Sequence, residues 1–270
     1  MEFYSLITGA TGGLGRAFVL ECASRGDNLI LTGTNKNKLE NITKEIIELY
    51  SNIKVISKIC DLSNEDSRND FFRFLDENEI NVNFLVNNAG AIIEGAFLSH
   101  TNDEILKAIR VNCEGTIDIT QRVLKRRIKE EPLHIITIAS MAGYYPMPYM
   151  ATYAGTKALL KNFMIALNHE MKGKNVFITT VCPSGIPTTD AMKEAIKSQG
   201  IAGQMTAASP EKIAKISLKG SKKHKVVVVP KGINKFIVLI SKLAGDKCLA
   251  KIVGRMWKKS QDKRDFKGEK

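Results

Sequence analysis

The chain has 270 residues, of which 44% are hydrophobic and 25% are charged, an ordinary globular composition that excludes disorder and collagen-like repeats. No apolar run approaches the roughly 18 residues of a membrane-spanning helix, and the first residues lack the basic and apolar regions of a secretion signal. We therefore expect a cytoplasmic protein. The five cysteines lie far apart without a CxxC pair, a pattern that indicates neither a disulfide framework nor a metal site.

The formal net charge of +12 is unevenly distributed along the chain. Residues 212–270 hold 18 lysines and arginines against 4 acidic residues, whereas residues 1–211 hold 22 basic and 24 acidic residues. A nucleic-acid-binding face would not be confined to one end of the sequence in this way, so we expect no nucleic-acid partner. A basic C-terminal segment suits an anionic membrane surface, an acidic ligand or simple solvation.

Short apolar runs alternate with longer helical patterns along the chain. Strands are expected at residues 3–8, 28–32, 55–60, 84–87, 134–139, 176–182 and 226–229, with helices between them at residues 14–25, 38–50, 64–78, 103–129 and 151–172. Several runs, such as Ile135-Ile136-Thr137-Ile138, are continuously apolar or β-branched, which is typical of strands buried on both faces of a parallel sheet. The pattern predicts an α/β fold: a doubly wound, Rossmann-type parallel sheet of about seven strands, forming a single domain over residues 1–230 with a helical extension over residues 231–270.

A glycine-rich turn follows the first expected strand, and a helical pattern begins directly after it. The turn reads Thr8-Gly9-Ala10-Thr11-Gly12-Gly13-Leu14-Gly15. Glycines at such a turn let the backbone approach a pyrophosphate while the helix N-terminus faces its negative charge. Taken alone, the turn is also compatible with a tight bend that binds nothing.

Further polar residues follow the later strands in a fixed order. Asn87-Asn88-Ala89-Gly90 ends the fourth strand, Asn112 lies in a helix, Ser140 follows the fifth strand, and Tyr153 precedes Lys157 by four residues. With the turn TGxxxGxG, this series resembles the short-chain dehydrogenase/reductase family, its hydroxysteroid dehydrogenase and ketoacyl reductase members in particular, over about residues 1–231. The spacing YxxxK alone carries little weight, because Tyr50-Ser51-Asn52-Ile53-Lys54 matches it too.

The chemistry of carbonyl reduction explains why these residue types occur together. Hydride transfer needs a proton donor at the developing alkoxide, and a lysine one helical turn from a tyrosine can stabilise the phenolate. The resemblance implies that Tyr153 is the acid/base, that Lys157 lowers its pKa and holds the nicotinamide ribose, that Ser140 binds the substrate oxygen, and that Asn112 orders a relay water, without a metal. Taken singly, Asn112 would be better explained by a hydrogen bond to the helix backbone, and Ser140 by a strand-end cap.

The resemblance also places cofactor contacts at the carboxyl ends of the strands. Asp61 is expected at the adenine, although it could instead cap the following helix through Ser63 or Asn64. Ser184 replaces the usual glycine of the family's PGxIxT motif, and it would be strained if that position required a positive φ. The expected contacts are Gly9, Thr11, Gly12, Gly13, Leu14, Gly15, Thr34, Asn35, Lys38, Asp61, Leu62, Asn88, Ala89, Gly90, Tyr153, Lys157, Pro183, Ser184, Ile186 and Thr188.

The residues after the second strand bear on the choice of nicotinamide. A carboxylate about 20 residues beyond the glycine turn would bind the ribose 2′-hydroxyl of NAD and repel a 2′-phosphate. No carboxylate occurs here before Glu40, whereas Lys36 and Lys38 are close. We therefore predict NADP(H), and NAD(H) stays possible because Gly12 occupies the place where many NADP(H) relatives carry a basic residue.

The substrate is poorly determined by sequence. Residues 141–150 hold three tyrosines and three methionines, which suit the wall of a site for a small hydrophobic ketone or alcohol and suit core or subunit contact equally well. A hydroxysteroid dehydrogenase-like activity is the first expectation. The alternatives are 3-oxoacyl reduction in lipid metabolism and a non-catalytic, dinucleotide-binding regulatory protein.

Apolar residues recur at helical spacing after the last expected strand, with lysines between them, and Gly245-Asp246 should divide the pattern into two helices. We expect this stripe to pack on the body of the protein or on a second subunit of a homodimer or homotetramer, and to close one side of the substrate cleft. Contact with a membrane surface is the less favoured alternative. The stripe consists of Phe236, Leu239, Ile240, Leu243, Leu249, Ile252, Val253, Met256 and Trp257.

Overall fold

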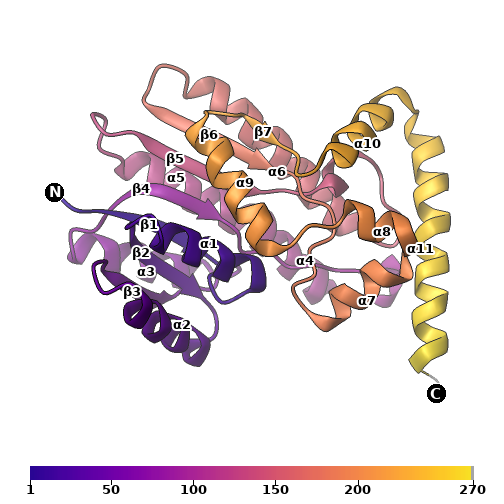
Figure 1. Ribbon diagram of the computed structural model, residues 1–270, viewed down its shortest axis with the longest axis horizontal. Coiled ribbons are helices and arrows are strands. Elements are labelled where there is room, and N and C mark those ends of the chain that lie inside the picture. Colours follow the sequence, from indigo (N-terminus) through magenta and orange to yellow (C-terminus); the bar gives the residue numbers. More distant parts are fainter. Residues whose placement is uncertain (269–270) are drawn as a thin grey trace.

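A computed structural model describes the backbone of residues 1–268 and the side chains of residues 1–258. Its centre is a seven-stranded sheet in the order β3-β2-β1-β4-β5-β6-β7, in which neighbouring strands run parallel (Figure 1). The strand order reverses between β1 and β4, and α/β sheets bind ligands at such a switch point, beyond the carboxyl ends of the strands. The strands are β1 (Phe3–Thr8), β2 (Asn28–Gly33), β3 (Val55–Ile59), β4 (Asn81–Asn87), β5 (Leu133–Ile138), β6 (Val176–Val181) and β7 (Val227–Val228).

Helices cover both faces of the sheet and enclose two apolar cores. One core contains side chains of α1 (Gly13–Ala23), α2 (Lys36–Leu49) and α9 (Pro210–Lys222). The other contains side chains of α3 (Glu65–Glu77), α5 (Thr116–Arg126) and α6 (Ala151–Glu170). This arrangement confirms the expected doubly wound α/β fold.

The continuous apolar runs of the strands supply both cores at once. Ile135 belongs to one core and Ile136 to the other, because successive side chains of a strand point to opposite faces. Leu6 and Ile7 divide between the two cores in the same way. All seven expected strands are present, and the largest difference is at β4, which begins at Asn81 instead of residue 84.

The single helix expected at residues 103–129 is divided into three parts. α4 (Asn102–Ile109) leads into a π-helical turn, η2 (Arg110–Gly115), which continues into α5. Gly115 packs so closely on Leu62 that a methyl group there would lie 2.5 Å from the Leu62 carbonyl oxygen. Apolar periodicity does not report such a change in helical winding, which often marks a functional site.

Three helices between β6 and β7 were not expected from the sequence: α7 (Asp190–Ser198), α8 (Gly200–Thr206) and α9. Their starts nevertheless carry recognisable signals. The hydroxyls of Thr189 and Ser209 accept hydrogen bonds from the first turns of α7 and α9, and Pro210 stands at the first position of α9. Two short 3₁₀ turns, η1 (Phe97–Ser99) and η3 (Met141–Tyr144), lie in loops after β4 and β5.

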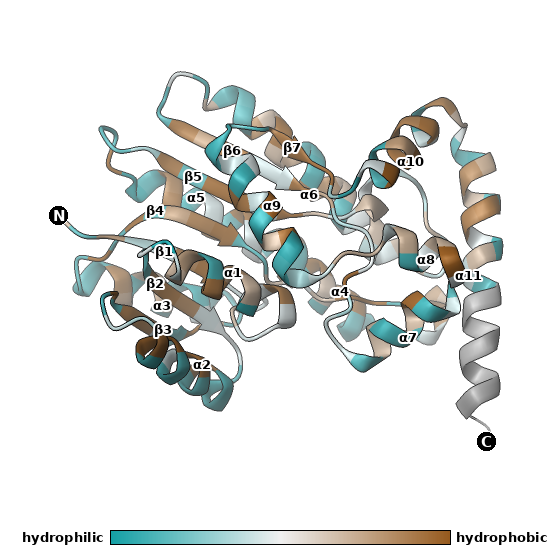
Figure 2. Ribbon diagram, viewed as in Figure 1, coloured by the Kyte–Doolittle hydropathy of each residue, from teal (hydrophilic) through white to brown (hydrophobic). Residues whose placement is uncertain are grey.

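The C-terminal extension forms α10 (Gly232–Leu243) and α11 (Asp246–Gly268), with the break where the sequence predicts it. α10 packs on η3 and α8, and α11 packs on α7. Hydrophobic residues occur along α10 and the first part of α11 (Figure 2). Packing of the apolar stripe on the body of the chain is not found for most of its residues, which are exposed in the single chain, and packing on a second subunit stays a prediction. The exposed members are Phe236, Leu239, Ile240, Leu243, Ile252 and Met256.

Candidate active site

The glycine turn after β1 is fastened to the end of β4. Gly9 has a φ of +63°, which favours glycine at this position. The side-chain amide of Asn88 donates hydrogen bonds to the carbonyl oxygens of Thr8 and Gly9, at 3.0 and 3.1 Å. The Thr8 hydroxyl in turn accepts from the backbone N–H groups of Asn88 and Ala89, both at 3.0 Å. The expected cofactor residues of β1 and β4 therefore lie side by side.

The N-terminus of α1 fits a pyrophosphate group. Its N-cap residue, Gly12, offers no side-chain cap, and no acidic residue lies in the first turn, so no side chain competes with an anion for the exposed N–H groups. A side chain at Gly15 would collide with the carbonyl oxygen of Gly9. The Thr188 side chain lies against Gly13, which brings the loop after β6 to the same turn.

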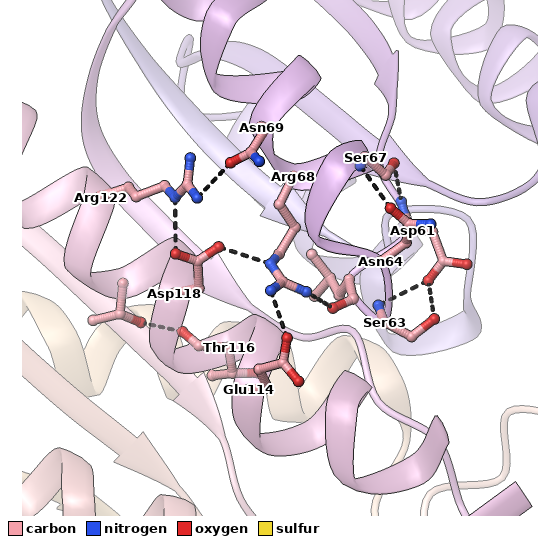
Figure 3. A network of polar contacts seen from close by, with 12 residues as sticks. Asp61, Ser63, Asn64, Ser67, Arg68, Asn69, Glu114, Thr116, Asp118 and Arg122 are labelled. Atoms are coloured by element: carbon pink, nitrogen blue, oxygen red, sulfur yellow. Dashed lines mark hydrogen bonds and ion pairs between the residues drawn. The ribbon is translucent and has the colours of Figure 1, made fainter. Parts of the chain in front are cut away.

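Asp61 does not cap α3. The cap is Asn64, whose side-chain oxygen accepts from the backbone N–H of Ser67 at 2.9 Å (Figure 3). The Asp61 carboxylate instead accepts from the backbone N–H and hydroxyl of Ser63, at 2.8 and 2.6 Å, and so shapes the turn between β3 and α3. Its contact with adenine stays a prediction.

A buried arginine connects this turn to the π-helical segment. Arg68 of α3 is only 3% exposed, and its guanidinium donates to the Leu62 carbonyl oxygen at 2.6 Å, to Glu114 at 2.6 Å and to Asp118 at 2.7 Å (Figure 3). Arg122 also donates to Asp118, at 2.8 Å. The arginine therefore fixes α3 to the helix that contains Asn112.

The residues after β2 are arranged by the start of α2. The Asn35 side chain accepts from the backbone N–H of Lys38 at 2.9 Å and caps the helix. Thr34 and Lys38 are exposed. Lys36 lies 3.8 Å from Glu40, an exposed ion pair of little energetic weight.

Asn112 is fully buried in the π-helical turn, where its amide joins three segments. It donates to the Ala91 carbonyl oxygen at 2.9 Å and to the Thr156 hydroxyl at 3.0 Å, and it accepts from the Ala91 N–H at 2.7 Å. These bonds reach the loop after β4 and helix α6, not its own helix. Thr156 was not identified from the sequence.

Lys157 is buried beside Asn112 and Tyr153. Its ammonium donates to the Ile138 carbonyl oxygen at 2.8 Å and lies 5.8 Å from the centre of the Tyr153 ring. A methyl group at Gly90 would lie 3.3 Å from the Asn112 amide oxygen and 3.5 Å from the Lys157 nitrogen, so these groups converge on one place. Burial lowers the pKa of Lys157 to about 8.

Ser140 lies at the end of β5 and contacts Tyr153. Its hydroxyl accepts from the Ala142 N–H at 3.1 Å, so the serine also caps η3, in agreement with its alternative interpretation as a cap at the end of the strand. Burial raises the pKa of Tyr153, while the hydrogen bond with Ser140 acts in the opposite direction. Burial has the largest effect on the phenol in this structure, and the expectation that Lys157 lowers the pKa of Tyr153 stays a prediction.

The loop after β6 is not strained at Ser184. The described residues other than glycine with a positive φ are Glu79, Tyr149, Asn175, His224 and Lys231, and Ser184 is not among them. Pro183 accepts from the backbone N–H of Met141 at 2.9 Å, which joins the ends of β5 and β6.

A second lysine of α6 supports the segment that follows Ser140. Lys161 donates to the Gly143 carbonyl oxygen at 2.7 Å and lies 4.1 Å from the centre of the Tyr144 ring. Tyr153, Lys157 and Lys161 are each four residues apart and share one helical face. That spacing could have identified Lys161 from the sequence.

A glycine turn at the switch point of a parallel sheet, next to a converging tyrosine, lysine, serine and asparagine, defines the class of NAD(P)-binding oxidoreductases. Residues 4–200 match the family model described as short chain dehydrogenase. The chain belongs to this family, whose members bind NAD(P) and act on CH–OH and C=O groups.

Curated relatives resemble the chain at about one-third identity. A very-long-chain 3-oxoacyl-CoA reductase of Neurospora crassa is 33% identical over 181 residues, which cover 66% of this chain and 54% of that protein. A 3-oxoacyl-[acyl-carrier-protein] reductase of Aquifex aeolicus is 31% identical over 220 residues, covering 79% of this chain and 88% of that protein. The chain thus spans about half the length of the fungal relative.

A solved structure titled for 7beta-hydroxysteroid dehydrogenase stereoselectivity shares the fold. Its TM-score is 0.83 at 21% identity, with 93% of this chain and 96% of that chain covered.

Proposed function

We propose that the protein is an NADPH-dependent reductase whose substrate is a hydrophobic 3-oxoacyl thioester. The observation that carries the proposed reaction is the convergence of Ser140, Tyr153 and Lys157 beside the glycine turn. The acyl substrate is supported by relatives named for 3-oxoacyl reduction at 31% and 33% identity. The hydroxysteroid substrate that the sequence placed first is supported by a likeness of fold alone.

Tyr153 acts as the acid in this reduction. When bound, the nicotinamide supplies a hydride to the carbonyl carbon at position 3 of the acyl chain. The Tyr153 phenol gives its proton to the carbonyl oxygen, and the Ser140 hydroxyl donates a hydrogen bond to that oxygen. Because burial raises the pKa of Tyr153, the phenol stays protonated at neutral pH and is ready to act as a donor.

Lys157 and Asn112 support the proton transfer. A pKa of about 8 keeps the Lys157 ammonium mostly charged at neutral pH, close enough to the ring to stabilise a developing phenolate. Asn112 holds Ala91 and Thr156 in place by three hydrogen bonds, and a relay water at its amide is part of the proposal. Tyr153 would regain its proton from solvent through this water and Lys157.

The residues around the ribose favour NADPH. Thr34 and Lys38 are exposed at the start of α2, where a 2′-phosphate would add negative charge near two lysines and the N-terminus of a helix. The proposed contact with the 2′-phosphate consists of Lys36, Lys38 and the first turn of α2.

The extension forms part of the proposed substrate site. α10 packs on η3, which directly follows Ser140. In α11, a methyl group at Gly254 would lie 3.1 Å from the side chain of Pro148, so the helix lies against residues 141–150. We place the acyl chain along this segment and assign closure of one side of the cleft to the two helices, in a homodimer or homotetramer.

A substrate screen tests the proposal. Purified protein should oxidise NADPH with 3-oxoacyl-CoA substrates and should prefer long acyl chains, whereas NADH should be used at least about tenfold less efficiently. Turnover of steroid ketones without turnover of any 3-oxoacyl thioester would contradict the substrate class. Tight NADPH binding without turnover of any ketone would favour the regulatory alternative.

A further inference from the structure

Helix α10 turns two polar residues and one valine toward the protein and most of its large apolar residues outward. Asn234, Val238 and Ser241 face inward, and Asn234 has no exposed surface. The opposite side carries large apolar residues at spacings of three and four, of which Phe236 is 57% and Leu243 is 84% exposed. We call this set the docking face; it consists of Ile233, Phe236, Leu239, Ile240 and Leu243.

Specific hydrogen bonds fix this orientation of the helix. The Asn234 amide donates to the carbonyl oxygens of Thr206 and Pro230, both at 2.9 Å. Just before the helix, the Lys231 ammonium donates to the Met205 carbonyl oxygen at 2.8 Å. Turning the apolar residues inward would move Asn234 to the outer side, break both bonds and leave the carbonyl oxygens of Thr206 and Pro230 without this donor, which is unfavourable. The outward apolar face therefore belongs to the folded state.

The surroundings of the docking face are strongly basic. Residues 232–258 contain six basic residues and one acidic residue. Lys235 and Lys242 are exposed on α10 itself. On α11, the exposed apolar residues Ile252 and Met256 again lie among basic side chains, namely Lys247, Lys251, Arg255 and Lys258.

Charge decides between the two kinds of surface that could cover these apolar residues. A second copy of the chain meeting the same face would bring its own lysines against those of the first, and like charges repel across an interface. An anionic bilayer offers hydrocarbon for the apolar side chains and phosphate or carboxylate groups for the lysines. No helix in the part of the chain that the structure describes is long and apolar enough to span a membrane, so contact would be with one leaflet.

We propose that the docking face binds the surface of an anionic membrane, with α10 lying in the plane of the interface. Its apolar side chains enter the boundary between headgroups and acyl chains, and the lysines of α10 and α11 contact anionic headgroups. The inward side of the same helix contacts η3, so the membrane surface and the segment after Ser140 lie on opposite sides of one helix. The binding itself does not depend on which ketone the site reduces.

Vesicle sedimentation with the full chain tests the proposal. The protein should sediment with vesicles of phosphatidylcholine containing about 30% phosphatidylserine at about 0.05 M salt, and much less with phosphatidylcholine alone. Raising the salt to about 0.5 M should weaken the binding at least about tenfold, because the charges are exposed and become screened. Absence of sedimentation with the anionic vesicles would overturn the proposal.

Two pairs of variants assign the binding to the docking face. Phe236→Ser with Leu243→Ser should lower the vesicle partition coefficient at least about tenfold, because two large apolar side chains no longer enter the lipid. The control is Ile47→Ser with Leu49→Ser, exposed apolar residues of α2, which should bind like the wild type.

The second pair reverses charge. Lys235→Glu with Lys247→Glu should weaken binding to anionic vesicles at least about tenfold, whereas the equal charge change Lys172→Glu with Lys174→Glu, on the exposed turn before β6, should have little effect. Unchanged binding in both docking-face variants would contradict the assignment. A wild-type dimer that Phe236→Ser with Leu243→Ser converts to a monomer, without vesicle binding, would identify the face as a subunit contact instead.

Discussion

Lys157 carries a charge that its surroundings disfavour. Burial lowers its pKa from 10.5 to about 8, a change worth about 3 kcal/mol against the charged form, and one backbone carbonyl is the hydrogen-bond partner that the structure gives its ammonium. A buried cation kept next to the proposed acid/base is what a catalytic role would require. The residue should therefore lower stability while it supports activity.

Replacing Lys157 with methionine should separate these two effects. Reductase activity, measured as kcat/KM, should fall about 100-fold or more, while the free energy of unfolding at pH 7 should rise by about 1–3 kcal/mol. Wild-type stability should increase as pH rises from about 8 to 10.5, because the folded chain binds fewer protons than the unfolded chain there. The difference in the free energy of unfolding between Lys157→Met and the wild type should therefore be largest below pH 8 and disappear near pH 10.5. A variant less stable than the wild type at pH 7 would contradict the claim that the buried charge lowers stability.

Thr34 offers a direct test of cofactor choice. The change Thr34→Asp should place a carboxylate where a 2′-phosphate is proposed and shift the ratio of kcat/KM for NADPH and NADH at least about tenfold toward NADH. Asn41→Asp adds the same charge at an exposed position further along α2 and should leave the ratio nearly unchanged. A wild-type enzyme that prefers NADH tenfold would contradict the interpretation of residues 32–38.

At the scale of elements, the strands were predictable and the breaks between helices were not. Apart from His134, β5 and β6 consist of apolar and β-branched residues, and their burial follows directly from that composition. The π-helical turn at Asn112 arises from contacts with Leu62 and Ala91, which lie far away in sequence. Local periodicity contains no information about such contacts.

The orientation of α10 could not be predicted from its sequence for the same reason. Its periodicity shows that one face differs from the other, but periodicity cannot say which face lies inward. The inward face is selected by Asn234, whose amide donates to Pro230 nearby in sequence and to Thr206, which only folding brings close to it.

Arg68 should contribute strongly to the packing of α3 on α5. Arg68→Ala removes the guanidinium, leaves the Leu62 carbonyl oxygen without this donor and leaves Asp118 with Arg122 as its remaining ion-pair partner, so the free energy of unfolding should fall by about 3 kcal/mol. The melting temperature should drop by about 8 °C. The exposed ion pair of Arg73 and Asp70 provides the control, since Arg73→Ala should leave the melting temperature nearly unchanged. Equal effects of the two variants would show that the Arg68 network is not important for stability.

At the scale of the whole molecule, the proposed cofactor site joins segments that are distant in sequence. The glycine turn, Asn88 and Thr188 come from three different loops, and these are held together at the carboxyl edge of the sheet. The sequence motifs identified each of these residues separately. Their mutual support, including the roles of Thr156 and Lys161, depends on folding and could not be inferred from the motifs.

A ligand that binds across these loops should stabilise the whole chain. At a concentration about 100 times its dissociation constant, NADPH should raise the free energy of unfolding by about 2.7 kcal/mol, and NADH at the same concentration should raise it less. Thermal unfolding followed by circular dichroism measures both effects. No shift with either nucleotide would contradict the proposed cofactor site.

The central claim is that Tyr153 donates the proton in a carbonyl reduction, and two tyrosine variants test it most directly. Tyr50 and Lys54 have the same sequence spacing as Tyr153 and Lys157, but Tyr50 ends α2 and Lys54 pairs with Glu2, away from the glycine turn. Tyr153→Phe should lower kcat with NADPH and a 3-oxoacyl-CoA substrate by about 100-fold or more while NADPH binding stays unchanged, and Tyr50→Phe should match the wild type. A Tyr153→Phe enzyme as fast as the wild type would contradict the proposed mechanism.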